Sequence, residues 1–215
     1  MRRIFSVSCA LLLLASCDSP TTTRPQFAYD PTTLTNGVLY RWPTASTVSV
    51  WVEPAEAIGP DLSNSVDRAI REWNDVALFA EFTLVRATSI ETSNVVVYDR
   101  IIPNPLAPAS CFFDPRGSGT TYFCLENGAA AAMRTSSGQQ TTATVLVSVD
   151  RGSTPFFADY DAVVAHELGH ALGIGGHSVD TDDVMYGNPS NPIPSPRDAQ
   201  TLRYVLGQRA SALLR

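Results

Sequence analysis

All three histidines of this 215-residue chain fall between positions 166 and 177, in the stretch HELGHALGIGGHS. His166 and His170 are four residues apart, so on an α-helix both side chains lie on one face, one turn from each other. Imidazoles in that relation can direct ring nitrogens toward one ion, and zinc accepts such ligands readily. The stretch therefore predicts a helix over residues 159–172 that carries part of a metal site.

Glu167 completes the pattern H-E-x-x-H and is our candidate catalytic residue. Its offset round the helix keeps the carboxylate out of the ligand set, yet near enough to take a proton from a water molecule whose pKa zinc lowers to about 7. We therefore predict one catalytic zinc ion, with Glu167 as general base in peptide-bond hydrolysis. Two exposed histidines on a helix can produce the same short pattern, but a third histidine nearby argues against that interpretation.

The third ligand is expected from the residues that follow the helix. Gly173 lies where the helix should end, because glycine adopts the left-handed conformation that reverses a chain. The reversal would make His177 available as the third ligand. The alternative is a carboxylate, giving a site of two histidines and one acid; the candidates are Asp180, Asp182 and Asp183.

HELGHALGIGGHS, followed shortly by DVMY, resembles the metzincin metalloproteases, and within them the matrixins with their pattern HExxHxxGxxH and a Met-turn. The eight residues from His177 to Met185 match the matrixin spacing. The resemblance covers most of residues 38–207 and implies a metalloendopeptidase whose zinc is held by His166, His170 and His177. It also implies that Met185 forms an apolar floor beneath the zinc without binding it.

The same resemblance implies how a protein or peptide substrate is bound. In matrixins the peptide lies antiparallel to the edge strand of the sheet, which would here come from residues 119–133. Residues 188–195, which contain three prolines, would form a wall of the pocket beside the zinc. Asp198, near the start of the last helix, would support the Met-turn from behind.

The chain departs from the matrixin pattern by one extra residue between Gly173 and His177. One residue adds at most about 3.3 to 3.6 Å of chain, and Gly175-Gly176 can absorb it as a bulge because neither residue has a Cβ. We therefore expect His177 to remain a ligand. If the insertion misplaced it, the chain would be a noncatalytic, zinc-containing binding or scaffold domain; Glu167 favours the enzyme, because a structural zinc site needs no general base.

The order of the elements predicts an α+β domain with one sheet, and the matrixin resemblance implies that the sheet is mixed and twisted. Val66, Ile70 and Trp73 recur at helical spacing and predict a long helix over residues 61–80. The run SPRD at residues 195–198 offers an N-cap, a first-turn proline and an acid for a last helix over 196–207. Alternating or apolar runs predict strands over 47–52, 81–86, 94–98 and 144–149.

The N-terminus indicates export. Two arginines precede an apolar run, residues 4–14, that is too short to span a bilayer. The following LASC resembles a bacterial lipobox, which implies removal of residues 1–16 and lipidation of Cys17; an ordinary cleaved signal peptide is the alternative. Residues 17–37 are Thr- and Pro-rich, which favours a tether to a domain at 38–215. We expect lipid anchoring to a bacterial cell membrane, facing the periplasm or the exterior.

The remaining cysteines bear on a disulfide. Cys9 leaves with the signal and Cys17 carries lipid, so Cys111 and Cys124 remain as a pair. Export permits a disulfide, and we predict one, which would contribute roughly 3 kcal/mol in the chain-entropy model. Two free, buried thiols are the alternative.

Net charge and composition limit the classes of binding partner that we expect. The chain carries a formal charge of -6, and all fifteen basic residues are arginine. An acidic chain without a basic cluster is a poor nucleic-acid binder, so none is expected. We expect a monomer. No clear calcium loop is present, and residues 114–119 are the remaining candidate for a structural Ca²⁺.

Overall fold

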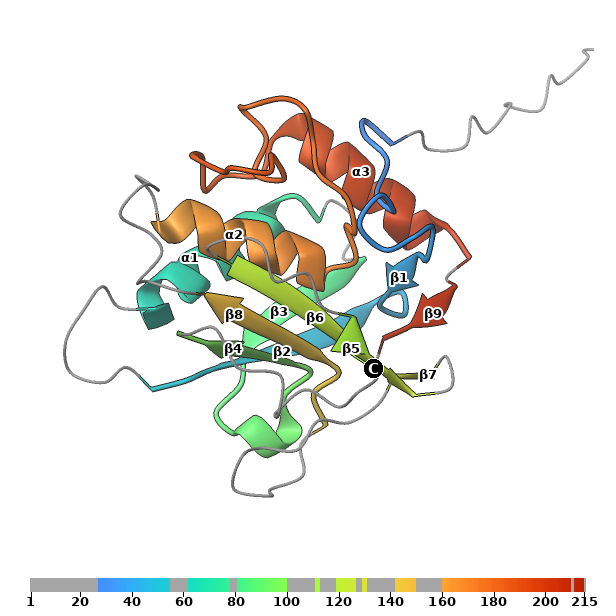
Figure 1. The fold of residues 1–215 in the computed structure, drawn as a ribbon. Coiled ribbons are helices and arrows are strands. Elements are labelled where there is room, and N and C mark those ends of the chain that lie inside the picture. The colour runs from blue at the N-terminus through green and yellow to red at the C-terminus, as the bar shows by residue number, and fades with distance from the viewer. Residues whose placement is uncertain are drawn as a thin grey trace, which may run out of the picture.

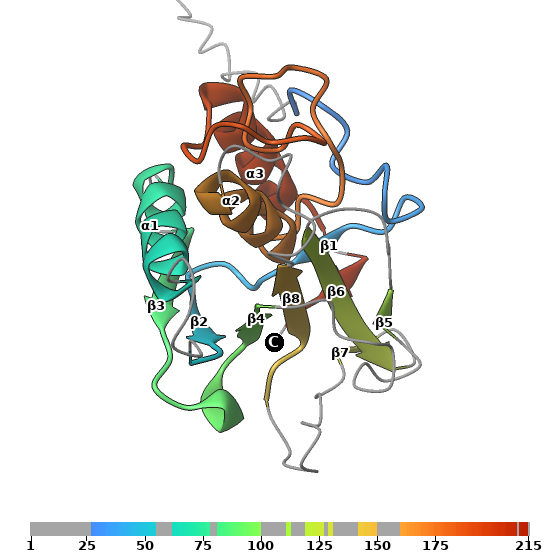
Figure 2. The ribbon, with the colours of Figure 1, turned by 60° about the vertical axis from the view of Figure 1, so that its left-hand side comes forward.

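The computed structural model describes residues 27–54, 62–77, 81–99, 111–112, 119–126, 129–130, 142–149, 160–209 and 211–214. These residues form three α-helices and a short 3₁₀ turn. The helices are α1 (Leu62–Asp75), α2 (Tyr160–Ala171) and α3 (Pro196–Gly207), and the 3₁₀ turn is η1 (Ile90–Thr92). In Figures 1 and 2, α1 and α2 lie against one face of the sheet, and α3 lies beyond α2.

The main sheet is mixed. Its strands lie in the order β3 (Phe82–Arg86), β2 (Ser46–Val52), β4 (Val95–Tyr98), β8 (Val145–Val149) and β6 (Gly119–Glu126). The first four are parallel, and β6 runs antiparallel to β8. Two short strands, β5 (Cys111–Phe112) and β7 (Ala129–Ala130), pair with β6, while β1 (Tyr40–Arg41) and β9 (Ala212–Leu213) form a separate parallel pair. The α+β class, the one mixed sheet and the three helices are thus confirmed.

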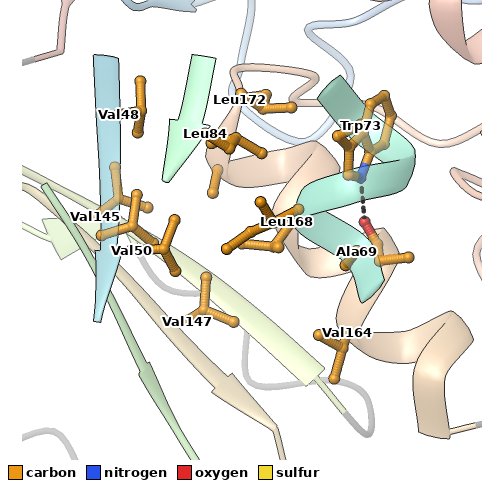
Figure 3. Close-up of a cluster of buried hydrophobic side chains, with 14 of the residues drawn as sticks. Val48, Val50, Ala69, Trp73, Leu84, Val145, Val147, Val164, Leu168 and Leu172 are labelled. Atoms are coloured by element: carbon orange, nitrogen blue, oxygen red, sulfur yellow. Dashed lines mark hydrogen bonds between the residues drawn. The ribbon is translucent and has the colours of Figure 1, made fainter. Parts of the chain in front are cut away.

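The core lies between this sheet and the helices, and α2 is packed on several sides by core residues. Inward-facing valines of β2 and β8 meet Leu168 of α2 and the apolar face of α1 (Figure 3). Every residue of α2 from Ala162 to Ala171 is buried, including the polar side chains of His166, Glu167 and His170. Trp73 donates its indole N–H to the Ala165 carbonyl at 2.8 Å, and Trp42 donates to that of Ala171 at 2.9 Å. Both indoles therefore fix the position of the helix that carries the H-E-x-x-H pattern.

Helix α1 is shorter than predicted: it ends at Asp75, whereas the predicted helix extended to residue 80. The side chain of Asn74, in the last turn of α1, pairs with the backbone of Leu84 in β3, accepting from its N–H at 2.8 Å and donating to its carbonyl at 2.9 Å. Asn74 therefore ties the end of the helix to the edge strand. Hydrophobic periodicity does not reveal a contact between a helix and a strand, so the prediction from periodicity placed the end of the helix too late.

Residues 27–37, hereafter the N-terminal segment, pack on the domain, although their composition predicted a tether. Tyr29 belongs to the core, with 8% of the residue exposed, and Thr35 is also buried. The ring of Phe27 contacts Tyr204 of α3 edge-on, with centroids 4.9 Å apart. The packed domain therefore begins before residue 38. The rest of the predicted tether, residues 17–26, and the signal lie outside the described residues.

Candidate metal centre

Helix α2 and the loop after it bring the three histidines together. Nε2 of His177 lies 3.2 Å from Nε2 of His166 and 3.3 Å from Nε2 of His170. Two nitrogens bound tetrahedrally to one zinc ion at about 2.0 to 2.1 Å are separated by about 3.3 to 3.4 Å. The spacing therefore fits a zinc ion. Within the described ranges, these histidines form the one cluster of three or more potential metal-ligating side chains.

Backbone carbonyls set the orientation of two of the rings. Nδ1 of His166 lies 2.7 Å from the Val184 carbonyl, and Nδ1 of His170 lies 2.6 Å from the Ile174 carbonyl. A carbonyl oxygen only accepts, so each Nδ1 carries the hydrogen and each Nε2 presents its lone pair to the centre. Burial lowers the pKa of His166 well below its usual value, and the neighbouring imidazoles lower it further. His166 is therefore held in the neutral form that a metal requires.

The chain reverses after α2 as predicted from Gly173. Gly173 has a φ of 107°, a backbone conformation that residues with a side chain rarely adopt. A Cβ there would also lie 2.5 Å from the Tyr40 carbonyl oxygen. Ile174 follows as a fully buried residue. The chain then passes through Gly175 and Gly176 and brings His177 back to the other two histidines. The extra residue thus does not carry the late histidine away from the centre.

None of the three aspartates considered as rival ligands belongs to the histidine cluster. Asp183 is buried against the hydroxyls of Ser178 and Ser195 and lies 2.9 Å from Nε of Arg197. Asp180 and Asp182 are not members of the cluster that could hold a metal. Burial alone would raise the pKa of Asp183, but the bonds from Ser178, Ser195 and Arg197 outweigh it and lower the pKa. Asp183 therefore ties the loop after His177 to the start of α3.

Met185 lies beneath the helix that carries the first two histidines. Its side chain is fully buried. A Cβ on Gly169 would fall 2.3 Å from Sδ of Met185 and 2.7 Å from Cζ2 of Trp73. Gly169 is therefore the position at which α2 lets Met185 and Trp73 approach its backbone, directly before His170.

Asp198 supports the turn that contains Met185. Its fully buried carboxylate accepts the N–H of Val184 at 2.8 Å and that of Met185 at 3.3 Å. It also accepts the hydroxyl of Tyr29 at 2.7 Å and, within the capping box of α3, the N–H of Ser195 at 2.8 Å. The expectation that Asp198 lies behind the turn is met, and Tyr29 is an additional partner that the sequence did not indicate.

Glu167 is buried beside the histidines, with 4% of the residue exposed. Strand β6 determines where its carboxylate lies. Thr121 Oγ1 lies 2.6 Å from Oε2, and a Cβ on Gly119 would lie 2.4 Å from Oε1. Gly119 and Thr121 are two apart and so share one face of the strand. The sequence placed the substrate-binding edge in this region but gave no sign that these two residues contact Glu167.

The other predicted sites are the disulfide, the lipidation site and the calcium loop, and the structure describes only part of them. The antiparallel register of β5 and β6 places Cys111 opposite Cys124, which is buried. The pairing of these two cysteines with each other stays a prediction. Cys17 and most of the calcium-loop candidate 114–119 lie outside the described residues.

No family model matches this sequence, and no curated protein matches it. Among solved structures, the chain is similar to the crystal structure of myroilysin, with 14% sequence identity and a TM-score of 0.41. The alignment covers 78% of this chain and 86% of that chain. The metal centre is therefore assigned from the geometry of its own residues: three converging imidazoles that could hold an ion such as zinc, with the buried carboxylate of Glu167 beside them.

Proposed function

We propose that this protein is a zinc-dependent endopeptidase. The observation that carries the proposal is the 3.2 and 3.3 Å spacing of the three Nε2 atoms, which fits tetrahedral zinc, next to a buried glutamate. Zinc held by His166, His170 and His177 supplies a Lewis acid that acidifies water and polarises a carbonyl. A purely structural site needs no such glutamate, so the arrangement favours catalysis over a binding or scaffold role.

The chain's own groups handle the proton and the substrate. Glu167 accepts a proton from the attacking water and passes it to the leaving amine. Thr121 holds Oε2, and Gly119 leaves room for Oε1. Met185 serves as the apolar floor of the site.

Strand β6 also supports a peptide substrate. Short strand β5 covers β6 only at Phe123 and Cys124, and β7 covers it at Leu125 and Glu126. Among the strands that the structure describes, the pairings of β6 with β5 and β7 therefore begin at Phe123, beyond residues 119–121. An extended peptide adding antiparallel at this edge would pass beside Glu167, with backbone hydrogen bonds providing affinity.

The proposal includes export and lipid anchoring through Cys17, supported by the signal and lipobox-like residues 1–17. None of the described helices is long and apolar enough to cross a bilayer. Mass spectrometry of the N-terminal peptide from membranes should find diacylated Cys17, and Cys17→Ala should release the protein from them. An unmodified N-terminus after a different cleavage would favour the ordinary signal peptide.

The proposal also includes the Cys111–Cys124 disulfide, supported by their paired register. Unreduced, unfolded protein should show no alkylation of either cysteine, and labelling of both would favour free thiols.

The central experiment measures bound zinc and the cleavage of an unfolded protein in parallel. Glu167→Gln should keep zinc and lose cleavage by about 100-fold or more, the usual contribution of a general base. Glu72→Gln makes the same chemical change on α1 and should leave both unchanged. His177→Ala should lose zinc and activity together.

Three results would each remove part of the proposal. Cleavage that survives Glu167→Gln would overturn the general-base role. Zinc retained at full affinity in His177→Ala would require another third ligand. Wild-type protein that binds zinc but cleaves none of a varied set of unfolded proteins would favour the noncatalytic binding domain.

A further inference from the structure

The N-terminal segment is attached at both of its ends to elements that surround the metal centre. Near its start, the Ala28 N–H donates to Thr201 Oγ1 of α3 at 3.2 Å, and Tyr29 donates to Asp198. Near its end, the Leu34 N–H donates to the Gly175 carbonyl at 2.8 Å. The segment thus bridges α3 and the loop that precedes His177.

Between these attachments the segment lies directly on the two glycines before His177. A Cβ on Gly176 would fall 2.0 Å from the Asp30 carbonyl oxygen and 2.8 Å from Thr33 Oγ1. A Cβ on Gly175 would fall 2.5 Å from Cγ2 of Thr35. Neither glycine has a positive φ. Both positions are therefore restricted by the close approach of the segment and not by their own backbone conformation.

The segment is itself held in a compact turn. Asp30 accepts the N–H of Thr32 at 2.8 Å, Thr35 donates its backbone N–H to the Thr32 carbonyl at 3.1 Å, and the Thr35 hydroxyl lies 2.6 Å from the Val38 carbonyl. Such local bonds fix the path of a short segment without a helix or strand. A fixed segment in contact with a glycine pair limits where that pair can lie.

We propose that the N-terminal segment positions His177 for the metal. It forms the outer wall against which Gly175-Gly176, the loop that contains the extra residue, is packed, and so it sets the location of the His177 imidazole. Through Tyr29 and Asp198 it is joined to the same turn whose Val184 carbonyl orients His166. Tyr29 is thus a positioning residue that does not touch the metal. The inference rests on the proposed zinc site, and it assigns a role to a stretch whose composition resembles a linker.

The test compares two tyrosines that each donate to an aspartate. Tyr29→Phe removes the hydrogen bond to Asp198. The control, Tyr160→Phe, removes a 3.2 Å hydrogen bond to Asp99, which does not involve the N-terminal segment. Tyr29→Phe should weaken zinc binding by about tenfold, the low end for losing support of a metal ligand, and Tyr160→Phe should leave it within about twofold. Zinc affinity is measured by competition with a fluorescent chelator, so peptidase activity is not needed.

A second readout uses the reciprocity of coupled equilibria. If the segment positions His177, zinc must in turn stabilise the segment. Zinc should slow hydrogen exchange of the Leu34 amide, bonded to Gly175, more than that of the Leu84 amide, bonded to Asn74 in a distant part of the fold. A purely structural segment would show equal effects on the two amides.

Gly176→Ala provides an independent variant. Its added Cβ must displace backbone at Asp30, so zinc affinity should fall by about tenfold or more while circular dichroism stays that of the wild type. Wild-type zinc affinity in Tyr29→Phe together with equal exchange at Leu34 and Leu84 would overturn the inference and leave the zinc site in place. Absence of zinc binding by the wild type would overturn both.

Discussion

The hydroxyl of Thr121 lies 2.6 Å from Oε2 of Glu167, although 46 residues separate the two in sequence. The same hydroxyl lies 3.0 Å from the Glu167 backbone carbonyl. A hydroxyl has a single hydrogen to donate, and the shorter contact is the one to the carboxylate. Strand β6 therefore fixes the group that the proposed reaction requires as its base.

Replacing Thr121 should affect the rate more than substrate binding. Thr121→Val keeps the shape of the side chain and removes the hydroxyl, and a hydrogen bond to a charged group is worth about 1.5 to 3 kcal/mol. We expect kcat to fall about 10- to 100-fold with KM nearly unchanged, as measured by steady-state cleavage of a quenched peptide. Thr121→Ser keeps the hydroxyl and should recover most of the rate. Equal loss in both variants would contradict a role for the hydroxyl.

Gly119→Ala tests the other side of the same carboxylate. The new Cβ would lie 2.4 Å from Oε1, and a side-chain end can move aside at small cost in stability. We expect a wild-type melting temperature and full zinc content, with kcat/KM reduced by about 100-fold, because small misplacements of a reacting group have effects of that size. Calorimetry, metal analysis and kinetics on one preparation would check this. An alanine variant with wild-type kcat/KM would show that the carboxylate has room to spare.

Gly169→Ala should reverse the usual effect of alanine in a helix. Alanine is favoured over glycine by about 1 kcal/mol in helix interiors, but here the Cβ would meet Met185 and Trp73. Overpacking of this kind costs about 1 to 3 kcal/mol, so we expect a net loss of stability in urea denaturation together with weaker zinc binding. The control is Gly207→Ala at the exposed end of α3, which should be neutral or stabilising. A stabilised Gly169→Ala would mean that the contact relaxes freely.

Asp183 should make stability depend on acid. Its pKa is lowered in the folded protein, because the bonds from Ser178, Ser195 and Arg197 outweigh the effect of burial, so the stabilisation is present above the unfolded pKa of about 3.9. It is lost as the pH falls through the lower, folded pKa. In urea titrations with chelator, Asp183→Asn should be less stable than wild type at pH 6, and the difference should shrink below about pH 4. Asp182→Asn, at an exposed site, should show little difference at either pH. A constant difference for Asp183→Asn would contradict the lowered pKa.

The predictable parts of this protein are those that local spacing decides. His166 and His170 share a helix face because they are four apart, and Gly173 ends the helix because a positive φ is needed there. Helix α3 begins and ends where predicted, since Ser195, Pro196 and Asp198 supply the cap within four consecutive residues. In each case the partners lie close together in the chain.

The parts that the sequence did not predict depend on contacts between separate elements of the fold. Asn74 of α1 binds Leu84 of β3, Thr121 of β6 binds Glu167 of α2, and Tyr29 reaches Asp198 of α3 across 169 residues. A threonine in a strand or a tyrosine in a Pro-rich stretch has the same local signature whether or not it has such a partner. The packing of the helices and the N-terminal segment against the sheet and against one another brings these groups together.

The position of Val184 bears on how relatives of this protein should be recognised. Its N–H binds Asp198 and its carbonyl orients His166, so the support passes through the backbone of a single residue and uses no side-chain chemistry of Val184. Evolution is then free to exchange Val184 for other apolar residues that fill the same buried space. Asp198 has no such freedom, because no backbone group can replace a buried carboxylate that accepts from three neighbouring amides. In divergent sequences, an acid retained at this position near the start of the last helix should therefore be a better sign of kinship than the residues of the turn itself.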